Sequence, residues 1–146
     1  MQLYNTKVIP AAEDVMWVSP ANLPRMEAAK LLVIAAHFDP GGSESTTLAK
    51  MMTACKLAPA DYAVVELSPT DRLPWRALME AGAPSRILLL GIHPAQLGIS
   101  AAFQQNHCNN FLSYVIIPGP GLAQLDQQPT IKRELWEQGL KPCFGL

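Results

Sequence analysis

Four short runs of apolar residues constrain the fold of this chain more than any other feature of its sequence. They are Leu31 to Ala35 (LLVIA), Tyr62 to Leu67 (YAVVEL), Ile87 to Leu90 (ILLL) and Tyr114 to Ile117 (YVII). Nearly continuous hydrophobicity over four to six residues is typical of strands that are covered on both faces. The runs therefore predict four buried, mostly parallel strands.

The segment after the first run has the spacing of an amphipathic helix. Four of its apolar residues fall at positions i, i+3, i+4 and i+7, and a serine stands ahead of them as a candidate N-cap, either Ser43 or Ser45. These apolar residues are Leu48, Met51, Met52 and Cys55. The spacing predicts a crossover helix between the first two strands.

Two further stretches, LPWRALMEAG and PTIKRELWEQG, also have helical spacing, with stops predicted at Gly82 and Gly139. The residues predicted to share one face are Trp75, Leu78 and Met79 in the first stretch, and Ile131, Leu135 and Trp136 in the second. Strands alternating with helices predict right-handed crossovers and a three-layer α/β/α sandwich around a four-stranded, mostly parallel sheet. We expect an α/β domain over residues 26–146, preceded by an arm or edge segment over residues 1–25.

Composition excludes some classes of function. The 146 residues include 11 basic and 12 acidic ones, which gives a net charge of −1 and argues against a protein that holds DNA mainly by phosphate contacts. The three cysteines, Cys55, Cys108 and Cys143, form no CxxC pair and predict neither a disulfide framework nor a metal site. Without a signal-peptide pattern or a run of about 18 apolar residues, the expectation is a soluble cytoplasmic protein that does not contact membranes.

Three strand ends carry the candidate site: AAHFDPGG, LLGIHPAQLG and VIIPGPGLAQL. In open α/β sheets, ligands bind outside the carboxyl ends of the strands, so we expect a cleft where these loops meet. The residues expected to line it are His37, Gly41, Gly42, Ser43, Gly91, His93, Gly119 and Gly121. Glycine and proline at these positions are also ordinary turn chemistry, and a single histidine at a strand end is more often a hydrogen-bonded structural residue.

In order and spacing, three stretches resemble the uracil-DNA glycosylase superfamily, particularly its short iron–sulfur branch. They are LLVIAAHFDPGGSES, SRILLLGIHPAQLGI and YVIIPGPGLAQLDQQPTIKRELWEQGLKP. The resemblance implies a glycosylase-like fold, but most catalytic groups have no counterpart. Pro118 to Gly121 stand where the family has a His-Pro loop, and Val65 stands where it has a uracil-reading asparagine. The cluster cysteines are missing too, so we expect no cofactor and no metal.

Asp39 is the one residue that aligns with a catalytic position, the water-positioning aspartate of the larger uracil glycosylases. An aspartate before a proline is also common in turns, where its side chain accepts main-chain N–H groups. Three alternatives follow: a non-enzymatic protein, which we favour; an atypical glycosylase that uses Asp39; or a small-ligand or nucleotide-binding domain that uses the GGSES helix start.

The sequence also resembles the psi subunits of bacterial DNA polymerase III, which have a glycosylase-like fold without glycosylase activity. The matching stretches are LLVIAAHFDPGGSESTTLAKMMTACKLAPADYAVVELSPTDRLP and LAQLDQQPTIKRELWEQ. This resemblance implies a DNA replication or repair accessory that binds clamp-loader or other polymerase III subunits, with weak single-stranded DNA contact left open. Met16, Trp17 and Val18 would anchor a docking arm, or this segment would form an edge hairpin.

Overall fold

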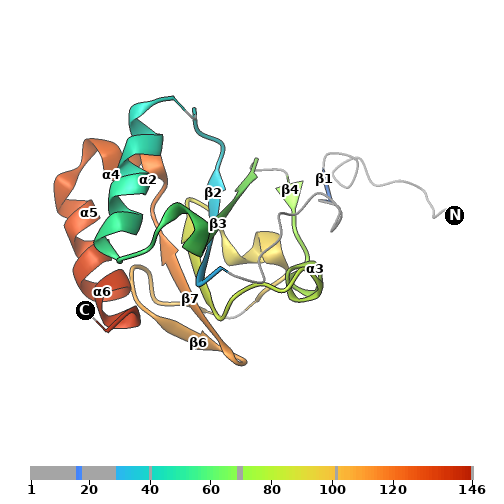
Figure 1. The fold of residues 1–146 in the computed structure, drawn as a ribbon. Coiled ribbons are helices and arrows are strands. Elements are labelled where there is room, and N and C mark those ends of the chain that lie inside the picture. The colour runs from blue at the N-terminus through green and yellow to red at the C-terminus, as the bar shows by residue number, and fades with distance from the viewer. Residues whose placement is uncertain (1–15, 18–28, 40, 69–70, 101, 146) are drawn as a thin grey trace, which may run out of the picture.

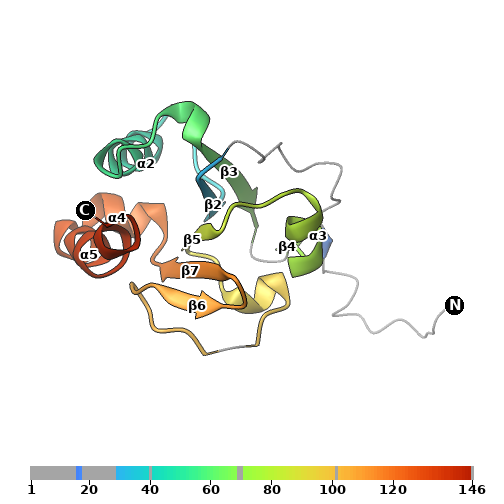
Figure 2. The ribbon, with the colours of Figure 1, turned by 60° about the horizontal axis from the view of Figure 1, so that its bottom comes forward.

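The main sheet has five strands, in the order β3-β2-β5-β7-β6 (Figure 1 and Figure 2). The computed structural model describes residues 16–17, 29–39, 41–68, 71–100 and 102–145. The strands are β2 (Leu31–Ala36), β3 (Tyr62–Leu67), β5 (Arg86–Leu90), β6 (Asn109–Phe111) and β7 (Tyr114–Gly119). Neighbours among β3, β2, β5 and β7 pair in parallel, so the four predicted strands are confirmed.

The fifth strand, β6, was not predicted and runs antiparallel to β7 at the edge of the sheet. Its sequence, NNF, lacks the apolar run of a buried strand. Asn109 holds the loop that leads into β6, because its side-chain amide donates to the carbonyl oxygens of Gln104 (2.9 Å) and His107 (2.8 Å). The four-stranded sheet that the sequence predicts is therefore extended by a short polar edge strand.

One face of the sheet is covered by α2 (Ser43–Ala54) and by the C-terminal helical segments (Figure 2). Those segments are α4 (Leu122–Gln127), α5 (Pro129–Leu135), the π-helical turn η4 (Trp136–Leu140) and α6 (Lys141–Cys143). The predicted apolar face of α2 is buried as expected. Its N-cap, however, is Gly42, and neither Ser43 nor Ser45 occupies that position.

The other face is covered by α3 (Trp75–Glu80) and by the 3₁₀ turn η3 (Pro94–Leu97), on a second core cluster. Leu78 is fully buried in that cluster and Trp75 packs against it. The prediction for Met79 was wrong, because its side chain is 49% exposed and Ala77 is buried instead. In this six-residue helix, Trp75 and Leu78 already span the inner face, and Met79 lies past its edge.

Gly139 does not end the last helix, contrary to the prediction. It is buried inside η4, which continues α5 and leads into α6. A β-carbon there would lie 2.9 Å from the carbonyl oxygen of Asn106 and 3.0 Å from Cγ2 of Ile117. Glycine is therefore present because the helix packs closely on β7 and on the loop before β6.

The order of the strands creates a switch point between β2 and β5. After β2, the chain passes through α2 on one face of the sheet and the 3₁₀ turn η2 (Pro59–Asp61) to β3, which lies on one side of β2. It then passes through α3 on the opposite face to β5, which lies on the other side of β2. Ligands of open α/β sheets bind beside such a point, at the carboxyl ends of the strands. The ends of β2 and β5 therefore position the candidate site.

A separate two-stranded sheet pairs β1 (Met16–Trp17) with β4 (Asp71–Arg72) in parallel. The rest of the predicted N-terminal arm, including Val18, lies outside the described residues, as do the side chains of Met16 and Trp17.

Candidate functional site

The loop after β2 lines a cavity of about 450 Å³ at the carboxyl end of the sheet. Its walls are His37, Phe38, Asp39, Gly42, Ser43 and Glu44. Four of the residues singled out from the sequence, namely His37, Asp39, Gly42 and Ser43, thus meet at one place. The buried Phe38 side chain anchors the loop in the core.

The carboxylate of Asp39 is engaged in its own turn. Its Oδ1 accepts a hydrogen bond from the amide of Gly41 at 3.1 Å, and its carbonyl oxygen accepts one from the amide of Gly42 at 3.0 Å. This is the geometry of an Asx-type turn, which a short acidic side chain stabilises locally. Asp39 therefore shapes the start of α2 from an exposed position.

His37 pairs with Glu66, which lies near the end of β3. Nδ1 of His37 is 2.9 Å from Oε1 of Glu66, and the same carboxylate oxygen accepts from the amide of Phe38 at 3.3 Å. The His37 side chain is 82% exposed, so the pair lies in water and is worth little energetically. Glu66 therefore holds the loop through the Phe38 amide, a role that its position in a mostly apolar run did not predict.

Gly91, Gly119 and Gly121 bring the ends of β5 and β7 close together. The amide of Gly91 donates to the carbonyl oxygen of Gly119 at 3.1 Å. A β-carbon on Gly91 would lie 3.0 Å from the α-carbon of Gly121 and 3.9 Å from the β-carbon of Ala36. The loops after β5 and β7 therefore approach each other closely at the carboxyl ends of the strands, next to the switch point between β2 and β5.

His93 lies apart from His37 and caps the η3 turn. Its Nδ1 accepts from the amide of Ala95 at 3.1 Å, and its own amide donates to Oε1 of Gln96 at 3.3 Å. It lines a different cavity, of about 320 Å³, together with Phe103 and Pro118. The structure therefore does not bring the two histidines into one site.

A polar cluster that sequence reasoning missed joins α2 to α4. Oδ2 of Asp126 accepts from the Ser43 hydroxyl at 2.6 Å, and Oδ1 accepts from the Thr47 hydroxyl at 2.8 Å. The Ser43 hydrogen bond, and then that from Thr47, lower the pKa of the Asp126 carboxyl. Ser43 thus links two helices. The signal in the sequence was weak, because the partners are separated by 83 and 79 residues.

The three cysteines lie in one region, with raised thiol pKa values at two of them. Burial, with a smaller effect of Cys143, raises the pKa of Cys55 to about 12. Burial first, and then Cys143, raise the pKa of Cys108 to about 11, and its thiol donates to the carbonyl oxygen of Gly139 at 3.1 Å. Across the described ranges, no three His, Cys, Asp or Glu side chains are grouped as metal ligands.

No helix in the part of the chain that the structure describes has the length and apolar character needed to cross a bilayer. No protein-family model matches the chain, and no curated protein matches it either.

Proposed function

We propose that this chain is a non-catalytic accessory protein of DNA replication or repair, with a three-layer uracil-DNA glycosylase-like fold, that acts by binding other proteins as psi subunits do. The observation that carries the proposal is the close approach of the loops after β5 and β7 at the carboxyl ends of the strands, where a β-carbon on Gly91 would lie 3.0 Å from the α-carbon of Gly121. A flipped base needs an open pocket at that place.

The side chains around the strand ends also favour a non-catalytic role. Release of a base requires polar groups that converge on the base and on its leaving charge. Val65 is buried and apolar, Pro118 is buried in β7, and Asp39 is engaged in its own turn. His37 is turned to Glu66, on the β3 side of the cavity. The groups present therefore stabilise a loop and do not form a catalytic constellation.

The proposed partners are clamp-loader or other DNA polymerase III subunits. This part of the proposal rests on the resemblance of the strand, loop and helix order to psi subunits. Met16, Trp17 and Val18 are the proposed anchors of the docking arm.

Two assays test the proposal. The first measures uracil release from a labelled single-stranded oligonucleotide, with a known uracil-DNA glycosylase as positive control and Asp39→Asn beside the wild type. The second measures binding of the purified chain to purified clamp-loader subunits, with Trp17→Ala beside Lys30→Glu, a control at an exposed residue. We expect no uracil release, and clamp-loader binding that Trp17→Ala weakens.

The cavity that His37 and Asp39 share is the observation that favours the alternative of an atypical glycosylase. Uracil release by the wild type that is lost in Asp39→Asn would establish that alternative and overturn the proposal. Failure of every clamp-loader subunit to bind would overturn the assignment of partners.

A further inference from the structure

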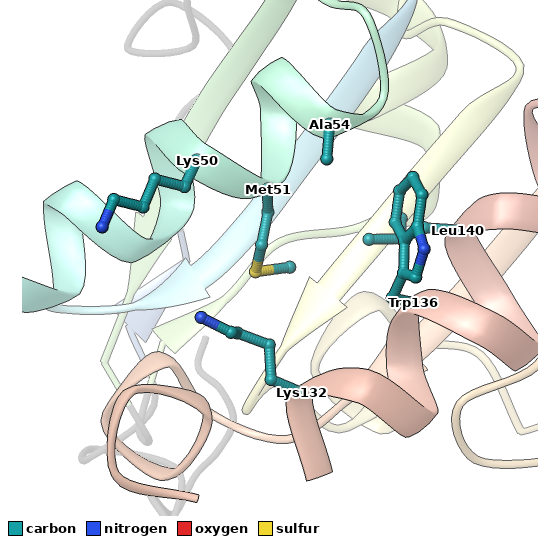
Figure 3. A pocket seen from close by; sticks show the side chains of 6 residues that line it. All are labelled: Lys50, Met51, Ala54, Lys132, Trp136 and Leu140. Carbon is teal, nitrogen blue, oxygen red and sulfur yellow. The ribbon is translucent and has the colours of Figure 1, made fainter. Parts of the chain in front are cut away.

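An apolar groove lies between α2 and the α5–η4 segment (Figure 3). Its volume is about 260 Å³, and its walls are Lys50, Met51, Ala54, Lys132, Trp136 and Leu140. That volume is below the roughly 300–1,000 Å³ of sites that enclose a small-molecule ligand. It suits one large apolar side chain.

The two ends of the groove differ in chemistry. Figure 3 shows Trp136, Ala54 and Leu140 at one end, the ammonium groups of Lys50 and Lys132 at the other, and Met51 between them. The Trp136 indole is half-buried, and tryptophan is enriched among the residues that dominate binding energies. Methionine adapts its shape to varied partners.

The positive end of the groove is not neutralised by its own walls. None of the six lining residues is acidic, and no ion pair within 4.0 Å joins Lys50 or Lys132 to a carboxylate in the described ranges. Asp126 is close enough for both lysines to contribute to lowering its pKa, but its oxygens already accept from Ser43 and Thr47. The lysines therefore remain open to an added negative charge.

We propose that this groove binds an acidic peptide segment of a partner protein, with one large apolar side chain inserted beside Trp136 and carboxylates placed at Lys50 and Lys132. The inference deepens the proposed function, on which it rests, by naming the chemistry of one partner segment. The positive charges of Lys50 and Lys132 favour acidic residues in the bound peptide, and the volume of the groove favours a single large apolar side chain.

The test is a fluorescence anisotropy titration of the full chain with an N-terminally fluorescein-labelled peptide, Gly-Ser-Glu-Glu-Asp-Leu-Phe. The same peptide with Gln-Gln-Asn in place of the acidic residues, and one with Lys-Lys-Lys there, report the role of charge. We expect Trp136→Ala to weaken binding at least about tenfold. We expect Lys50→Glu and Lys132→Glu each to weaken it about five- to tenfold.

Further variants guard against a trivial loss of folding. Ala54→Glu places a carboxylate in the groove from an exposed position on α2 and should also abolish binding. Lys30→Glu is the matched charge reversal outside the groove and should leave the Kd within about twofold. The double variant Lys50→Glu/Lys132→Glu should prefer the Lys-Lys-Lys peptide. Circular dichroism confirms that each variant is folded.

Three outcomes overturn the inference: no binding of the acidic peptide, equal binding of the neutral peptide, or a dimer in sedimentation that Ala54→Glu dissociates. The last would make a second copy of the chain the occupant. The titration contains neither DNA nor clamp-loader proteins. If the acidic peptide does not bind while the clamp-loader subunits still do, only the proposal that the groove binds an acidic peptide is rejected. Uracil release together with peptide binding rejects only the proposed function.

Discussion

A β-carbon on Gly91 would lie 3.0 Å from the α-carbon of Gly121, so the loops after β5 and β7 approach each other closely at this pair. Gly91 also has φ = +76°, a conformation that other L-residues adopt only at a cost. The packing of these two loops and the stability of the domain therefore both depend on Gly91.

We predict that Gly91→Ala destabilises the protein more than Gly98→Ala does. Gly98 has the same φ of +76°, but nothing lies within 4 Å of the place that a β-carbon would take, so it carries only the conformational cost of roughly 1–2 kcal/mol. Gly91→Ala adds overpacking of about 1–3 kcal/mol. Urea unfolding of both variants measures the difference, and equal losses would contradict close packing at Gly91.

Gly139→Ala should destabilise the protein, although alanine replacing glycine in a helix normally stabilises it by up to about 1 kcal/mol. The new β-carbon would meet the Asn106 carbonyl oxygen at 2.9 Å and Ile117 at 3.0 Å. We expect a loss of about 1–3 kcal/mol in urea unfolding. Gly41→Ala is the control, because its nearest neighbour is 4.0 Å away. A more stable Gly139→Ala would show that η4 does not pack as described.

Asp126→Asn should lower the thermal midpoint near neutral pH, because an amide cannot accept from both Ser43 and Thr47 as a carboxylate does. The folded state lowers the pKa of Asp126 below its ordinary value of 3.8. Its stabilisation is therefore present above about pH 4 and is lost as pH falls through the folded pKa. Midpoints measured from pH 7 to pH 2 should converge for the variant and the wild type. Glu137→Gln, at an exposed residue of η4, should change the midpoint little.

Cys55 and Cys108 should react slowly with iodoacetamide at pH 8. Their pKa values of about 12 and about 11 keep both thiols protonated, whereas the thiolate is the nucleophile. Peptide mass spectrometry should show labelling of Cys108 that increases as the pH approaches 11, with Cys55 protected further by its 4% exposure. In urea both should react rapidly. Equal rates for Cys55 in folded and unfolded protein would contradict its burial.

Leu112→Asn should stabilise the turn between β6 and β7. Leu112 is 74% exposed and has φ = +56°, so its side chain gains little from packing and its backbone is strained. Asparagine tolerates this conformation better, and we expect a gain of about 0.5–1 kcal/mol in urea unfolding. A loss would indicate that the leucine makes a contact that outweighs the strain.

Periodicity in the sequence predicted what the core requires, and it failed where long-range packing decides. The apolar runs of β2, β3, β5 and β7 could be read because both faces of each strand are covered. β6 was missed because Asn109 and Asn110 give no apolar pattern, and α4 was not predicted as a separate helix. Gly139 looked like a helix stop because its neighbours in space, Asn106 and Ile117, are distant in the sequence.

The candidate site shows the same division. The sequence placed His37, Asp39, Gly42 and Ser43 on one short loop, and the structure keeps them around one cavity. The separation of His93 from them depends on how η3 turns after β5, which local patterns do not encode. The groove that contains Lys50 and Lys132 was not predicted, because its walls come from helices that are distant in the sequence.

The cover of β2 has a consequence for how the chain folds during synthesis. Leu31 and Val33 begin the main sheet, yet the cluster that buries them also contains Leu122, Leu125, Leu135 and Leu140. A nascent chain that has emerged only as far as β7 would cover this face of the sheet with α2 alone. The core on this face is therefore complete only once the C-terminal helices have been synthesised.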